Sequence, residues 1–64
     1  MKRQYLISYL LKEGCLLVRE GAKHSVFFSP LMKKSSTVPR HNEINSFLAR
    51  KICRDLGVKE IRKR

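Results

Sequence analysis

Two histidines stand beside basic residues in this sequence, an arrangement suited to acid–base chemistry at a phosphate. His24 follows Lys23 in the stretch REGAKHSVFFSP, and His41 follows Arg40 in the stretch PRHNE. An imidazole can accept and donate a proton near neutral pH, while adjacent cations can stabilise charge that develops on phosphorus. His24 is therefore a candidate acid–base residue. The alternative is a structural histidine that hydrogen-bonds a neighbouring carbonyl group.

The basic residues indicate where a polyanion would bind. The chain of 64 residues has 15 Lys and Arg against 5 Asp and Glu, for a formal net charge of +10. This excess predicts a polyanionic partner: a nucleic acid, an acidic protein or an anionic membrane. The candidate contacts are Lys23, Lys33, Lys34, Arg40, His41, Arg50, Lys51 and Arg54. The last three could equally be a solvated helix face, and His41 a second acid or base or an exposed loop residue.

The cysteines and apolar runs bear on the compartment. Cys15 and Cys53 have no CxxC or Cys/His spacing, which argues against a zinc site and favours buried free thiols, with one disulfide as the alternative. The start MKRQYLISYLL lacks a small-residue cleavage site, and no apolar run approaches the ~20 residues of a membrane span. These features predict a cytoplasmic protein without a membrane span. Membrane-surface binding is disfavoured because the core needs the apolar stripes of both expected helices.

The first half of the sequence predicts one helix and two strands. A helix over residues 3–13 ends at Gly14, and its apolar stripe contains Leu6, Ile7, Tyr9, Leu10 and Leu11. Strands follow over residues 15–20 and 23–29, joined by a turn at Gly21-Ala22. Alternation in the second strand places His24, Val26 and Phe28 on one face, and Ser25 and Phe27 on the other.

The second half predicts a strand and a closing helix. A basic loop at residues 31–35 leads to a short strand at 36–39, which Pro39 ends or marks as an edge. A helix over about 45–56 follows, capped by Asn42 or Asn45 and stopped by Gly57. Its expected apolar stripe is Phe47 or Leu48, then Ile52 and Leu56, flanked by Ala49 and Cys53.

The order of these elements defines the expected fold. An α-β-β-β-α chain predicts an α+β domain over residues 1–58, with a three-stranded antiparallel sheet and both helices on one face. The other sheet face stays open for a partner. Residues 59–64 form a basic C-terminal tail.

With these elements in place, the sequence resembles the HicA toxins of bacterial and archaeal toxin–antitoxin systems over about residues 2–58. The matching pieces, in order, are LLKEGC, LLVREG, KHSVFF and STVPRHNEINSFLARKICRDLG. The family's catalytic histidine, usually in a G-S-H or G-G-H context, corresponds to His24. Here Ala22 and Lys23 precede that histidine, and Gly21 lies one step earlier.

The resemblance implies a fold like the double-stranded RNA-binding domain and an endoribonuclease that cleaves mRNA. It also implies a HicB-like antitoxin that covers the active surface. The chain would form a homodimer or a toxin–antitoxin hetero-oligomer. Because RNA supplies its own 2′-OH nucleophile, His24 would need no metal or cofactor. Two alternatives stay open: a non-catalytic RNA-binding module, and a protein that docks an acidic partner.

Overall fold

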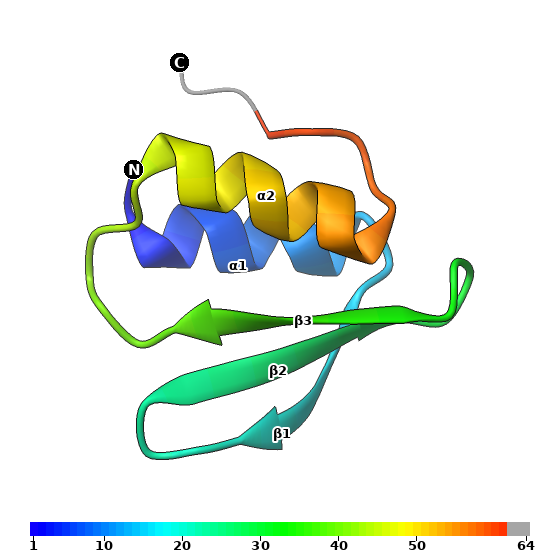
Figure 1. Cartoon of the computed structure of the whole chain (residues 1–64), viewed down its shortest axis with the longest axis horizontal. Coiled ribbons are helices and arrows are strands. Elements are labelled where there is room, and N and C mark those ends of the chain that lie inside the picture. Colours follow the sequence, from blue (N-terminus) through cyan, green and yellow to red (C-terminus); the bar gives the residue numbers. More distant parts are fainter. Residues whose placement is uncertain (62–64) are drawn as a thin grey trace.

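The computed structural model describes residues 1–61 and has the expected element order (Figure 1). The elements are α1 (Arg3–Lys12), β1 (Leu16–Glu20), β2 (His24–Ser29), β3 (Lys34–Pro39) and α2 (Ser46–Leu56). The three strands form one antiparallel sheet in the order β1-β2-β3, and both helices lie on the same side of it. This topology confirms the α+β prediction and is consistent with a double-stranded RNA-binding-domain-like fold.

The sheet register assigns residues to its two faces. His24 is paired with Pro39, Val26 with Thr37 and Phe28 with Ser35, so these residues share the face that the helices leave open. Ser25 and Phe27 are buried beneath the helices. The predicted alternation of the second strand is therefore confirmed, and it places His24 at the solvent-exposed start of β2.

The ends of α2 follow from its flanking residues. The Asn45 side chain accepts a hydrogen bond of 2.7 Å from the amide of Phe47, which selects Asn45 over Asn42 as the N-cap. Gly57 ends the helix with a φ of 73°, a left-handed conformation that favours glycine. A Cβ on Gly57 would also lie 2.8 Å from Cγ of Met32, because the β2–β3 turn packs against this end of the helix.

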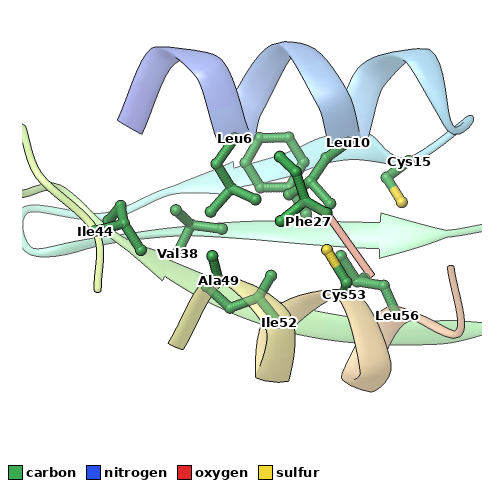
Figure 2. Close-up of a cluster of buried hydrophobic side chains, with 11 residues drawn as sticks. Leu6, Leu10, Cys15, Phe27, Val38, Ile44, Ala49, Ile52, Cys53 and Leu56 are labelled. Carbon is green, nitrogen blue, oxygen red and sulfur yellow. The ribbon is translucent and has the colours of Figure 1, made fainter. Parts of the chain in front are cut away.

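The core lies between the helices and the sheet. Figure 2 shows Leu6 and Leu10 of α1 beside Phe27 of β2, with Ile52 of α2 in the same buried cluster. The remaining buried apolar residues are Cys15, Val38, Ile44, Ala49, Cys53, Leu56 and Ile61. Both cysteines are free thiols, and burial raises the pKa of each. A raised pKa keeps these thiols protonated and unreactive near neutral pH.

The structure refines several local expectations. The loop expected at residues 31–35 is shorter, because β3 already begins at Lys34. Leu11, expected in the α1 stripe, is 52% exposed because it lies off that stripe. Of the two alternatives for the α2 stripe, Leu48 packs against the core, while Phe47 is 75% exposed. Residues 59–61, expected in the tail, contact the domain: Ile61 is buried, and Tyr9 donates a hydrogen bond to the Lys59 carbonyl. Residues 62–64 of the expected tail lie outside the described residues.

The edge strand β1 is the least covered element. It lies farthest from the helices in Figure 1, and Leu16, Leu17 and Val18 are each about half exposed. A β-bulge interrupts its pairing with β2 between Leu17 and Arg19. Among the described residues, no helix is long and apolar enough to cross a membrane.

Candidate active site

One end of the molecule gathers the residues that the sequence analysis singled out for chemistry. The β1–β2 turn, the end of β3 and the beginnings of both helices meet there (Figure 1). A pocket of about 370 Å³ at this end is lined by Ala22, Lys23, His24, Pro39, Arg40 and His41. The structure therefore brings both histidines and two predicted cations into one site, although the histidines lie on different elements.

Backbone hydrogen bonds hold the His24 turn in place. The amide of Gly21 donates to the His24 carbonyl at 2.7 Å, which closes the β1–β2 turn. The amide of Arg40 donates to the Lys23 carbonyl at 3.2 Å and extends the pairing of β2 with β3 past Pro39. His24 is thus anchored through its backbone on both sides, while its side chain stays exposed at the pocket.

A side-chain relay joins helix α1 to the same turn. Ser25, 1% exposed, accepts a hydrogen bond of 2.7 Å from Nη2 of Arg3 and donates one of 2.7 Å to Oε1 of Glu20. The same Glu20 oxygen accepts a hydrogen bond of 2.6 Å from Nη1 of Arg40. Because each buried polar atom in this relay has a partner, the relay is a fixed link between α1, the turn and the pocket.

The pocket combines groups that a phosphodiester reaction requires. Its two imidazoles can move protons, and Lys23 and Arg40 can bind a phosphate oxygen. Arg40 is held by Glu20, so its guanidinium is oriented before any ligand arrives. An open, exposed pocket gives a long chain such as RNA direct access to these side chains.

The other predicted basic contacts lie elsewhere. Lys33 and Lys34 are at the β2–β3 turn, the opposite end of β2 from His24, about 17 Å away at ~3.3 Å per strand residue. They cannot close around the His24 edge, because the whole length of β2 separates them from it. Lys33 itself adopts a φ of 55° in that turn.

The basic residues of α2 contact neighbours on the helix surface, and two of the three form ion pairs. Lys51 forms an ion pair of 3.1 Å with Asp55, and Arg54 forms one of 3.1 Å with Glu60. The guanidinium of Arg50 lies 5.1 Å from the centre of the exposed Phe47 ring, a cation–π contact. The three cations therefore form a surface layer on the helix, and none of them lines the histidine pocket.

A second pocket, which the sequence did not predict, adjoins the first. It has a volume of about 410 Å³ and is lined by Lys2, Arg3, Gln4, Arg40 and Asn42. Arg40 lines both pockets, so the two adjoin. Lys2, Arg3 and Gln4 of this pocket lie at the start of α1. The signal in the sequence was the pair of cations Lys2-Arg3 at the start of a helix, where the helix dipole disfavours positive charge.

Comparison with known proteins adds one finding. A family model described as the HicA toxin of bacterial toxin–antitoxin systems matches residues 3–58 of the 64. The match runs from the first residue of α1 to just past the cap of α2, and includes every residue of the histidine pocket. No curated protein matches the chain, and no solved structure does.

Proposed function

Because the chain belongs to the HicA family of bacterial toxins, we propose that it is an endoribonuclease that cleaves messenger RNA in the cytoplasm. The observation that carries the proposal is the single pocket that holds His24 together with His41, Lys23 and Arg40. This grouping supplies proton transfer and phosphate binding within one site.

The proposed reaction uses the nucleophile of the substrate. His24 takes the proton from a ribose 2′-OH, and the resulting oxygen forms a bond to the adjacent phosphorus. The bond from phosphorus to the 5′-oxygen of the next nucleotide breaks, and that oxygen takes up a proton. The products are a 2′,3′-cyclic phosphate and a free 5′-hydroxyl. His41, on the same pocket, is the group that supplies the second proton.

The cations stabilise the pentavalent phosphorus centre through which this reaction passes. Arg40 presents a guanidinium that Glu20 orients, and Lys23 is the neighbour of His24 along the chain. Positioned donors of this kind stabilise the transition state more than the ground state, because negative charge builds up on the phosphate oxygens during attack.

The proposed partner is a HicB-like antitoxin. Toxin–antitoxin families pair a toxin with a neutralising partner, and the net charge of +10 favours a partner with an acidic surface. An acidic surface over the histidine pocket would neutralise Lys23 and Arg40 and exclude RNA from the site. The resulting assembly is a toxin–antitoxin hetero-oligomer.

A non-catalytic RNA-binding module is the second candidate. The observation that favours it is the turn before His24, where Ala22 and Lys23 replace the Gly-Ser or Gly-Gly of the family pattern. Such a module would bind RNA with a steep salt dependence and would keep its affinity without His24.

A paired growth and cleavage assay tests the proposal. Cells expressing the unsubstituted chain, His24→Ala or the exposed control Lys12→Ala are followed for growth, and the purified proteins are incubated with a long RNA in EDTA. The unsubstituted protein and Lys12→Ala should stop growth and cut RNA, while His24→Ala should do neither. RNA binding without cleavage by the unsubstituted protein would instead select the binding module.

A further inference from the structure

We infer that the pocket formed by Lys2, Arg3 and Arg40 is a second phosphate-binding site, which holds the phosphodiester next to the one that is cleaved. The inference rests on the proposed function for the identity of the ligand as RNA. It assigns a role to residues at the start of α1, which the histidine pocket does not include.

The lining of this pocket is chemically one-sided. Lys2, Arg3 and Arg40 are cations, and Gln4 and Asn42 carry amides that donate hydrogen bonds. Of the described residues, none with a carboxylate lines it. A phosphodiester offers only acceptor oxygens and a negative charge, so every lining side chain can donate to it. The volume of about 410 Å³ is in the range of small-ligand pockets.

The arginines of the pocket are held in place before a ligand binds. Arg3 donates from Nε to the Pro39 carbonyl at 2.8 Å and from Nη2 to the buried Ser25 hydroxyl at 2.7 Å. Arg40 is held by Glu20 at 2.6 Å. A guanidinium that is already oriented loses less conformational entropy on binding than a free one.

The balance of charge near the pocket remains positive. Glu20 offsets one of the two arginine charges, and the Glu43 carboxylate pairs with the amino group of Met1 at 3.2 Å. Lys2 and Arg3 therefore keep positive charges that a second phosphate would neutralise. The site consists of side chains rather than helix amides, because the Arg3 amide already donates to the Asn42 carbonyl at 2.9 Å.

The shared residue Arg40 defines the path of the substrate. It is in the lining of both pockets, so an RNA strand bound at the histidine pocket can continue into the second one. Gln4 and Asn42 then face the nucleotide that follows, where their amides can donate to and accept from a ribose or a base edge.

The test measures binding of a short single-stranded RNA by fluorescence anisotropy over a series of salt concentrations. All proteins carry His24→Ala to prevent cleavage, and any tag is placed at the C-terminal end. Lys2→Ala should weaken RNA binding about fivefold at low salt. It should also make the negative slope of log K against log salt shallower by about 0.7, the value for one phosphate contact to a single strand. The control Lys12→Ala, at the other end of α1, should change neither.

A second readout separates this inference from the proposed function. With His24 intact, Lys2→Ala should slow cleavage of a longer RNA and leave unchanged the cleavage of a dinucleotide, which has only the scissile phosphate. Equal binding by Lys2→Ala and Lys12→Ala would overturn the second site, whatever the cleavage result. Absence of cleavage by the unsubstituted protein would overturn the ribonuclease proposal, while the anisotropy series would still decide the second site.

Discussion

Glu20 and Arg40 form an ion pair of 2.6 Å between the last residue of β1 and the residue that follows β3. The pair connects the end of β1 to the segment after β3, beside the turn that carries His24. The same carboxylate oxygen accepts a hydrogen bond from Ser25. About half of each side chain is exposed, so the contribution of this pair to stability is small. Its consequence is geometric, because it fixes a guanidinium beside the imidazole.

His41 should act as the general acid of the proposed cleavage. His41→Ala is expected to slow cleavage of RNA about 10²–10⁴-fold, the range that a positioned general acid contributes. The measurement is kcat/KM on RNA. A nitrophenyl ester of uridine 3′-phosphate, whose leaving group needs no proton, should be cleaved at nearly the unsubstituted rate. Equal slowing on both substrates would contradict an acid role.

Ser25→Ala should destabilise the domain and misplace the active turn. The substitution removes a hydrogen bond from Arg3 and one to Glu20 at a buried site, which costs about 1–3 kcal/mol in the free energy of unfolding. Urea denaturation measures this loss. On RNA, kcat should fall more than KM rises, because the substituted side chain does not touch substrate. The matched control is Ser35→Ala on the open sheet face, which should leave stability and kcat unchanged.

Gly57→Ala should cost more stability than Gly14→Ala. Both glycines have a positive φ, 73° and 91°, so each alanine introduces backbone strain of about 1–2 kcal/mol. Only Gly57 faces a neighbour, with Met32 Cγ 2.8 Å from the added Cβ, while nothing lies within 4 Å at Gly14. When both glycine substitutions are made in a protein that also carries Met32→Ala, the unfolding free energies of the two variants should lie closer together. An unchanged difference between them would show that contact with Met32 is not its cause.

Asp55 should make folding more favourable at neutral than at acidic pH. The hydrogen bond from Lys51, aided by one from the Ser36 hydroxyl, holds the pKa of the Asp55 carboxyl below its usual range. A lowered folded-state pKa stabilises the fold above the unfolded-state pKa, and this stabilisation is lost as the pH falls through the folded-state value. Asp55→Asn should therefore be less stable than the unsubstituted chain at neutral pH, with the gap in urea midpoint closing on acidification.

A matched substitution tests whether that pH dependence belongs to Asp55. Glu13 lies at the end of α1 and takes part in no ion pair among the described residues. Glu13→Gln should leave the urea midpoints close to those of the unsubstituted chain across the same pH range. A gap between Asp55→Asn and the unsubstituted chain that stays constant with pH would contradict the assignment.

Local patterns in the sequence were sufficient for the element order and for the exposure of His24. Alternation along β2 predicted that His24 lies on the other face of the sheet from Ser25 and Phe27. The helix cap at Asn45 and the helix end at Gly57 could be predicted from the residues next to them. The start of β3 was predicted two residues too late. The turn before it is closed by a hydrogen bond from the Lys33 amide to the Ser29 carbonyl, and Leu31 and Met32 within it are not typical turn residues.

The site was only partly predictable, because its parts come from distant segments. Arg3 reaches Ser25 across 22 positions and Pro39 across 36. Such contacts depend on how α1 crosses the end of the sheet, which periodicity does not encode. The same limit explains why His41 could be taken for an ordinary loop residue, whereas the fold places it on the pocket of His24.

The bulge in β1 bears on how copies of this chain behave toward one another. Leu16, Leu17 and Val18 present apolar side chains along a free sheet edge, a surface that in a regular strand would template the addition of further strands and lead to fibrils. The extra residue interrupts the regular spacing of the amides and carbonyls along the edge. This irregularity disfavours continuous strand pairing between copies and so opposes fibril growth from this edge.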